Sequence, residues 1–201
     1  MELLTISDIS LSFGGLKALS KVDMEIQSGL ITSIIGPNGA GKTSLLNCIS
    51  GFYHPTSGEI HYNGRRLTHS SPHQVSKMGI ARAFQNLELF SGMTVLDNLL
   101  LARHQNLRYN FFQAIIYAGK TSRVEAENRN YVEEEKEDMV RFVMDIRKER
   151  NTTVVLVEHD LGVVMDISDH IYVLDFGELI GYGQPEEVAV NPKVIEAYIG
   201  E

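Results

Sequence analysis

The stretch of sequence that decides the fold reads Gly36-Pro37-Asn38-Gly39-Ala40-Gly41-Lys42-Thr43. It fits the pattern G-x-x-x-x-G-K-[ST], which is typical of a loop that binds phosphate groups. An apolar, β-type run precedes it at residues 31–35, and the helix-forming residues Leu45 and Leu46 follow it. The motif therefore lies between a strand and a helix, which is the context that it requires, and it predicts an α/β nucleotide-binding domain.

The residue types of this loop suit phosphate chemistry. Glycines at positions 36, 39 and 41 allow backbone conformations that other residues avoid. Successive N–H groups then form an anion-binding concavity at a helix N-terminus. Lys42 offers a positive charge to the β- and γ-phosphates, and the Thr43 hydroxyl is a ligand for Mg²⁺. The predicted cofactor-binding residues of the loop are Gly36, Pro37, Asn38, Gly39, Ala40, Gly41, Lys42, Thr43 and Ser44.

Composition limits the remaining possibilities. A chain of 201 residues is long enough for one domain, or for a core with a subdomain. Its formal net charge of −8 argues against a nucleic-acid-binding surface, which is normally basic. No apolar run approaches the roughly 20 residues that span a bilayer, and the N-terminus does not look like a signal peptide. The single cysteine, Cys48, cannot form an internal disulfide, which suits a reducing compartment.

Hydrophobic patterns predict the order of the other elements. The expected strands are residues 6–13, 22–26, 31–35, 59–62, 80–84, 152–157 and 171–174. The expected helices are the one that follows the loop and runs to Gly51, residues 94–104, residues from about 109 to 150, and a short one opened by Pro192. The dipeptide Asn63-Gly64 is typical of a β-hairpin turn.

The order of these motifs resembles the ATP-binding subunit of ABC transporters, and most closely the branched-chain amino-acid uptake subfamily. The resemblance covers residues 1 to about 133 and about 137 to 201. Its parts are residues 11–19, which look like the adenine-stacking loop, and Ala83-Phe84-Gln85-Asn86, which looks like the Q-loop. Val157-Glu158-His159-Asp160 looks like the switch loop, and Asn191 to Tyr198 is similar to the C-terminal tail of the subfamily.

The resemblance implies roles for three more residues and two cofactors, ATP and Mg²⁺. Phe13 would stack on the adenine base, although a phenylalanine at this position can also be a core residue. Gln85 would reach Mg²⁺ or a water near the γ-phosphate, so the implied metal ligands are Thr43 and Gln85; without the family match, Gln85 reads as an ordinary polar residue. His159 would sense the γ-phosphate at the end of its strand, where a lone histidine is more often structural. The implied catalytic residues are therefore His159 and Gln85.

The resemblance also implies an architecture and partners. We expect one domain over residues 1–201, an α/β P-loop NTPase core with a mostly parallel sheet, an N-terminal antiparallel β subdomain and a truncated helical subdomain. The implied partners are transmembrane permease subunits and a second ATP-binding subunit, in a homo- or heterodimer, and no nucleic acid. The implied location is cytoplasmic, peripheral on the inner face of the plasma membrane.

The chain departs from the family in its middle. It contains neither a Leu-Ser-Gly-Gly-Gln-type signature nor an apolar strand ending in Asp-Glu. Phe90-Ser91-Gly92-Met93 and Ile171-Tyr172-Val173-Leu174-Asp175 resemble these motifs faintly, but each lies at the wrong place in the order. Between Tyr131 and Met139 the sequence passes from the middle of the family's helical subdomain to the helix before the switch strand. Several dozen residues are therefore missing near positions 133–137.

Two structural expectations follow from this junction. A helical stripe of Val132, Met139, Val143 and Ile146 crosses it, and no Pro or Gly interrupts residues 121–150. We therefore predict one long helix from about Thr121 to Arg150. We also predict that the missing strand leaves a gap beside strand 153–157.

Three functional hypotheses remain open. The first, which the family resemblance implies, is an ATP-binding subunit of an amino-acid importer. This chain would bind ATP but be defective in hydrolysis, because the water-polarising Glu is missing. Glu158 is the only carboxylate next to the switch strand. The second is a non-catalytic or regulatory nucleotide-binding subunit, or a non-functional deletion product. The third is a P-loop GTPase or small-molecule kinase, against which the ABC-type motifs argue. The absence of any Asn-Lys-x-Asp or Asp-x-x-Gly argues further against a GTPase.

Overall fold

The computed structural model describes residues 2–83, 135–158 and 160–199. The chain divides into two compact units, one formed by Met1–Arg82 with Lys136–Glu201 and the other by Ala83–Glu135. The first unit contains both of the sheets. The helix predicted at 94–104 and the part of the long helix before Glu135 lie outside the described residues, as do Gln85 and His159.

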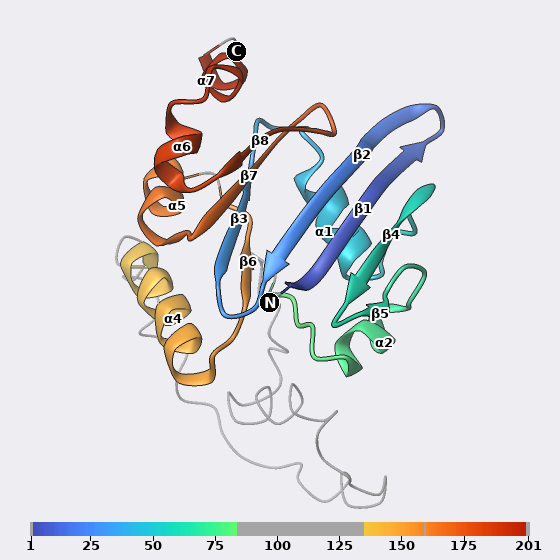
Figure 1. The fold of residues 1–201 in the computed structure, drawn as a ribbon, viewed down its shortest axis with the longest axis horizontal. Coiled ribbons are helices and arrows are strands. Elements are labelled where there is room, and N and C mark those ends of the chain that lie inside the picture. The colour runs from blue at the N-terminus through green and yellow to red at the C-terminus, as the bar shows by residue number, and fades with distance from the viewer. Residues whose placement is uncertain (1, 84–134, 159, 200–201) are drawn as a thin grey trace, which may run out of the picture. The chain divides into compact units, whose positions relative to one another are not determined.

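The N-terminal half of this unit is an antiparallel sheet with the strand order β2-β1-β4-β5 (Figure 1). Its strands are β1 (Glu2–Phe13), β2 (Leu16–Gln27), β4 (Ser57–Tyr62) and β5 (Arg65–Arg66). The β4–β5 turn is Asn63-Gly64, whose φ angles of 51° and 72° lie in the left-handed region, as a type I′ hairpin turn requires. The predicted antiparallel β subdomain and its hairpin are confirmed.

The second sheet is mostly parallel and has the order β6-β3-β7-β8. Its strands are β3 (Ile31–Ile35), β6 (Val154–Leu156), β7 (His170–Asp175) and β8 (Glu178–Gly183). β3 runs parallel to β6 and β7, whereas β8 pairs antiparallel with β7. All five residues of β3 are buried, as a central strand covered on both faces demands. This sheet confirms the predicted α/β core.

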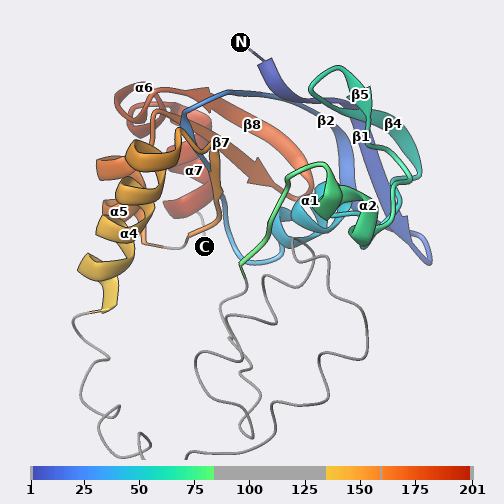
Figure 2. The ribbon, with the colours of Figure 1, turned by 90° about the horizontal axis from the view of Figure 1, so that it is seen from below.

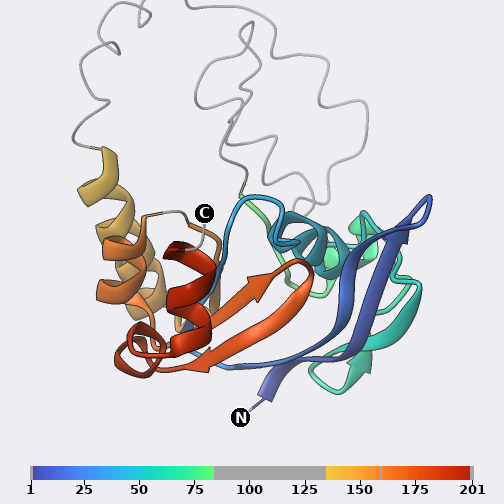
Figure 3. The same ribbon diagram turned by 90° about the horizontal axis from the view of Figure 1, so that it is seen from above.

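Helices cover both faces of the second sheet. Figures 2 and 3 show α1 (Lys42–Ile49) on one face and α5 (Leu161–Ile167), α6 (Pro185–Ala189) and α7 (Pro192–Ile199) on the other. Leu45 and Cys48 of α1 join the core that also holds the inward side chains of the antiparallel sheet. Burial of Cys48 raises the pKa of its thiol to about 11, so it is a packing residue rather than a nucleophile. A short helix, α2 (Pro72–Lys77), follows the antiparallel sheet.

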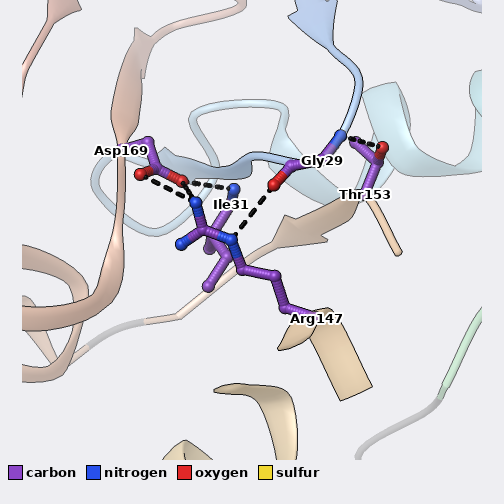
Figure 4. Close-up of polar contacts among 5 residues, drawn as sticks. All are labelled: Gly29, Ile31, Arg147, Thr153 and Asp169. Carbon is purple, nitrogen blue, oxygen red and sulfur yellow. Dashed lines mark hydrogen bonds and ion pairs between the residues drawn. The ribbon is translucent and has the colours of Figure 1, made fainter. Parts of the chain in front are cut away.

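The helix after the junction, α4, runs from Glu135 to Arg150 and is fastened to the core by Arg147 (Figure 4). Asn151 follows it with a φ of 49°, a left-handed conformation that commonly ends a helix. The described part of the predicted long helix is therefore helical, with neither loop nor strand between Glu135 and Arg150.

One predicted strand is wrong. Residues 80–83 of the expected strand 80–84 have no regular secondary structure, and Phe84 lies outside the described residues. An extended segment becomes a strand only where a neighbouring strand accepts and donates its hydrogen bonds. Within the described residues no strand lies beside this segment. The segment instead begins at the end of α2, where the Ile80 N–H donates to the Val75 carbonyl at 3.4 Å.

β6 is an edge strand in the part of the chain that the structure describes. It pairs with β3 over Val154, Val155 and Leu156, and all three residues are only half-buried. The gap predicted beside strand 153–157 is therefore present among the described residues. The strand itself is shorter than expected, because only these three residues pair with β3.

Tyr172 joins the two sheets, and its removal is the first testable change. Its hydroxyl accepts a hydrogen bond from the Glu25 N–H at 3.0 Å and donates one to the Glu25 carbonyl at 2.9 Å. Tyr172→Phe leaves both backbone groups of Glu25 without this partner, so it is expected to lower the free energy of unfolding by about 1–3 kcal/mol. Urea denaturation followed by circular dichroism measures this. The control is Tyr53→Phe, since the Tyr53 hydroxyl makes no hydrogen bond to the described residues.

The stability that the Tyr172 contact contributes should decrease at high pH. Burial raises the pKa of Tyr172 to about 12, from an ordinary value of 10.0. A raised pKa means that the folded protein holds this proton more tightly than the unfolded chain does. The stability that Tyr172 contributes is therefore complete below pH 10 and is lost between about pH 10 and 12. Wild type and Tyr172→Phe should become more alike in stability across that interval; a difference that stays constant would contradict this assignment.

Candidate functional site

The phosphate-binding loop connects β3 to α1 in a conformation that only glycine allows at two positions. Gly36 has a φ of 146°, and a Cβ there would lie 2.0 Å from the Leu174 carbonyl oxygen of β7. Gly41 has a φ of 98°, and its Cβ would lie 2.6 Å from the Ala18 carbonyl oxygen of β2. The loop therefore packs against a strand of each sheet with no room for side chains at these two positions.

Two backbone hydrogen bonds hold the loop in this place. The Gly177 N–H, in the β7–β8 turn, donates to the Ala40 carbonyl at 3.0 Å. The Ser20 N–H of β2 donates to the Gly177 carbonyl at 2.8 Å. The β7–β8 turn thus bridges the loop and β2, so the position of the loop is set by both sheets.

Lys42 lies across the loop rather than in solvent. Its side chain is 6% exposed, and its Nζ donates to the Gly36 carbonyl and, at 2.7 Å, to the Pro37 carbonyl. A buried ammonium is stable only where oxygen atoms surround it. Phosphate oxygens are acceptors of the same kind as these carbonyl oxygens. The ammonium of Lys42 therefore lies within the turn of the loop, where a bound phosphate could also accept from it.

The N-terminus of α1 supplies the second feature that suits an anion. The helix begins at Lys42 with Gly41 as its N-cap, so the N-cap residue has no side chain that could accept from the first N–H groups, and no acidic residue lies in the first turn. Thr43 is exposed and Ser44 is half-buried. This arrangement fits a triphosphate, with the Thr43 hydroxyl accessible to a metal ion. Within the described residues, no group of three or more His, Cys, Asp or Glu side chains is placed to hold a metal.

Phe13 is the last residue of β1 and is 46% exposed, so it is not a core residue. Its ring makes an edge-on contact with Tyr53, with centroids 5.2 Å apart and planes inclined by 73°. β2, the other strand of its hairpin, contacts the phosphate-binding loop through Ala18. The structure thus leaves Phe13 accessible on the hairpin that borders the loop, as base stacking requires.

The segment around the predicted switch residue lies at the correct edge of the sheet. β3 and β6 are parallel, so their carboxyl ends meet at one edge, where ligands bind in open α/β sheets. The phosphate-binding loop follows β3, and Glu158 and Asp160 follow β6. Both residues are half-buried, and Asp160 caps α5 by accepting from the Gly162 N–H at 3.1 Å. His159 itself lies outside the described residues.

The chain that leads toward Gln85 is tied to the helix of the phosphate-binding loop. Arg82 Nη1 donates to Asn47 Oδ1 of α1 at 2.6 Å, and burial lowers the pKa of the guanidinium from its ordinary value. Sequence reasoning missed both Asn47 and Tyr53. The only signals were a polar residue among the apolar residues of the second half of α1 and an aromatic pair, Phe52-Tyr53, before a turn.

The comparisons with known proteins identify the family. The family model described as ABC transporter matches residues 19–162, and the model described as Branched-chain amino acid ATP-binding cassette transporter matches residues 178–201. The chain belongs to the ABC transporter family. No helix among the described residues is long and apolar enough to cross a membrane.

Named relatives agree with this assignment over the whole chain. The high-affinity branched-chain amino acid transport ATP-binding protein LivG of Salmonella typhimurium is 34% identical over 250 residues, covering 99% of this chain and 98% of the relative. BraF of Pseudomonas aeruginosa, with the same description, is 33% identical with the same coverage. Among solved structures, the ADP conformation of an ATP-binding cassette of an ABC transporter is similar with a TM-score of 0.81, 26% identity and full coverage of both chains.

The length of these alignments bears on the missing segment. The alignment to LivG spans 250 positions, whereas this chain has 201 residues, so at least 49 positions of the relative have no counterpart here. Because 99% of this chain and 98% of the relative are covered, almost all of these positions lie inside the alignment. The chain is therefore shorter than this relative internally, as its motif order predicts.

Proposed function

We propose that this chain is the ATP-binding subunit of an ABC importer for branched-chain amino acids, and that it binds Mg-ATP but hydrolyses it poorly. The observation that carries the proposal is the phosphate-binding loop. Its glycines pack against both sheets, and its Lys42 ammonium is buried over the turn of the loop. The descriptions of the relatives LivG and BraF support the transported class.

The proposal gives roles to the described residues of the site and to Gln85. The backbone from Gly36 to Gly41 and the first N–H groups of α1 bind the phosphates, and Lys42 neutralises their charge. Phe13 stacks on the base. When bound, Mg²⁺ supplies charge stabilisation to the phosphoryl group, and Thr43 and Gln85 are the residues that would hold it.

The hydrolytic half of the site is the incomplete half. Phosphoryl transfer to water needs a residue that orients the attacking water, and His159 and Gln85 are the proposed residues near the γ-phosphate. The chain lacks the Asp-Glu pair at a strand end and the signature motif. The internal shortening and the edge of β6 that no described strand covers support the loss of this part. They equally favour the second candidate, a non-catalytic or regulatory subunit, or a non-functional deletion product.

The proposed partners follow from the family. The chain would associate with transmembrane permease subunits and with a second ATP-binding subunit, on the cytoplasmic face of the plasma membrane. The family assignment supports both partners, since energising transport needs a membrane component and no helix among the described residues could cross a membrane.

Replacement of Lys42 tests nucleotide binding. Lys42→Ala removes charge-assisted hydrogen bonds to phosphate, which are worth about 1.5–3 kcal/mol, so Mg-ATP affinity should fall by roughly 10- to 150-fold. Isothermal titration calorimetry measures it, with Lys193→Ala as the matched control because Lys193 is an exposed lysine of α7. Equal affinities for wild type and Lys42→Ala would exclude this loop as the site.

A further inference from the structure

The segment after α1 is fixed on both sides of Tyr53. The Phe52 and Tyr53 N–H groups both donate to the Asn47 carbonyl at the end of α1, at 2.9 Å and 3.1 Å. Three residues later, the Thr56 N–H donates to the Ser10 carbonyl of β1 at 2.7 Å. The backbone of Tyr53 is therefore held between the helix of the phosphate-binding loop and the strand that carries Phe13.

The strand is fastened close to Phe13 as well. The Ser12 N–H, one residue before Phe13, donates to Thr56 Oγ1 at 3.2 Å. These bonds place the Tyr53 ring beside the Phe13 ring in the edge-on geometry that aromatic pairs prefer. An exposed phenylalanine at the end of a hairpin strand would otherwise be free to change rotamer.

The contact orients the Phe13 ring but does not cover it. Phe13 remains 46% exposed and Tyr53 37% exposed, so a flat ligand can still lie against the pair. Leu16, the cross-strand partner of Phe13, is 73% exposed, which extends the apolar surface. The surface therefore suits the apolar face of a nucleobase whose phosphates lie in the loop at the start of α1.

We propose that Tyr53 is a positioning residue for the nucleotide base: it holds the Phe13 ring in the stacking orientation and couples that ring to the end of α1. The inference rests on the proposed function and deepens it. Because Tyr53 acts through Phe13, it contributes to the affinity for the base and not to the affinity for the phosphates. It acts through its ring, so its hydroxyl is dispensable.

The test compares two ligands that share a triphosphate. Mg-ATP and Mg-tripolyphosphate are titrated into wild type and the Tyr53 variants by calorimetry. Tyr53→Ala and Tyr53→Leu should weaken Mg-ATP binding about two- to tenfold and leave tripolyphosphate affinity unchanged. Tyr53→Phe should bind as wild type does. In a Phe13→Ala background, Tyr53→Ala should have no further effect, because coupled residues are not additive.

A matched control separates positioning from general destabilisation. Tyr182 on β8 is 48% exposed and stacks on Tyr172 at 4.3 Å, so Tyr182→Ala removes a comparable aromatic pair from the other sheet. It is expected to lower the melting temperature and to change the affinity for neither ligand. Equal losses of ATP and tripolyphosphate affinity in Tyr53→Ala would overturn the inference, as would a Tyr53→Phe variant as weak as Tyr53→Ala. An ATP affinity that depends on Lys42 but not on Tyr53 would overturn this inference alone. Failure of wild type to bind either ligand would overturn the proposed function with it.

Discussion

ATP hydrolysis by this chain is expected to stay near background, both alone and mixed with an intact ABC subunit. Loss of a general base typically lowers a rate by about 10²- to 10⁴-fold, and loss of groups that stabilise the transition state lowers it further. The chain lacks both the Asp-Glu strand end and the signature motif. Phosphate release should therefore be at least about 10³-fold slower than in an intact relative, while Mg-ATP binding remains measurable in the same preparation.

A graft gives this expectation its control. The internal segment of LivG that has no counterpart here, at least 49 positions, can be inserted between Val132 and Met139 of this chain. The grafted chain should gain turnover that Lys42→Ala abolishes. Robust turnover of the ungrafted chain would contradict the expectation, and its loss in Glu158→Gln would identify Glu158 as a replacement base.

The phosphate-binding loop could be predicted because the residues of its motif are contiguous in sequence. β3, the three loop glycines and the start of α1 all lie within residues 31–43. At Gly36, both the positive φ and the clash that a Cβ would make with the Leu174 carbonyl oxygen require glycine. The sequence shows these requirements directly as a glycine at that position. The roles of Gln85 and His159 remain predictions, because neither residue lies in the described part of the chain.

Contacts between distant segments could not be predicted in the same way. From the sequence, Phe13 could be either a base-stacking residue or a core residue. The sequence shows an aromatic residue there but does not show whether other side chains cover it. Tyr53 is forty positions away, and it reaches Phe13 only because Thr56 pairs with β1. The strand predicted at 80–84 failed for a related reason. Its local pattern favoured a strand, but a segment becomes a strand only where a neighbouring strand pairs with it.

Three further elements were missed for identifiable reasons. α2 and α6 are too short for an apolar period, although each carries a readable start signal, a capping box at Ser71 and at Gln184 followed by proline. β8 was obscured by its glycines, which suggested turns. Gly181 is a strand residue that pairs with Val173 of β7, and a Cβ there would lie 2.9 Å from Val194 of α7. The glycine therefore lets the last helix pack closely.

The second large effect is expected from Arg147, which ties α4 to the core. Figure 4 shows its guanidinium between two acceptors: Nε donates to the Gly29 carbonyl at 3.0 Å, and Nη2 lies 3.1 Å and 3.0 Å from the two carboxylate oxygens of Asp169. Asp169 also accepts from the Ile31 N–H at 2.8 Å, and the Gly29 N–H donates to Thr153 Oγ1 at 2.8 Å. The network joins α4 to the starts of β3, β6 and β7.

Arg147→Met is expected to lower the free energy of unfolding by about 2–3 kcal/mol, because it leaves a partly buried carboxylate without its cation. Arg147→Lys should recover only part of this, since an ammonium cannot contact both acceptors with the same fork geometry. Urea denaturation measures the changes. Arg66→Met is the control: it removes a 3.0 Å ion pair with Glu59 in which both side chains are about half exposed, and it should change stability by less than about 1 kcal/mol.

The loss should be concentrated at β6. Only three residue pairs join this strand to β3, and in the described part of the chain no strand supports its other edge. The bond between Gly29 and Thr153 fixes the residue before β6, and Arg147 fixes the turn that carries Gly29. Amide hydrogen exchange at residues 154–156 should therefore accelerate in Arg147→Met more than exchange in β7, which is paired on both sides. Uniform acceleration across the sheet would show instead that the arginine stabilises the fold as a whole, and that β6 is held by contacts other than this network.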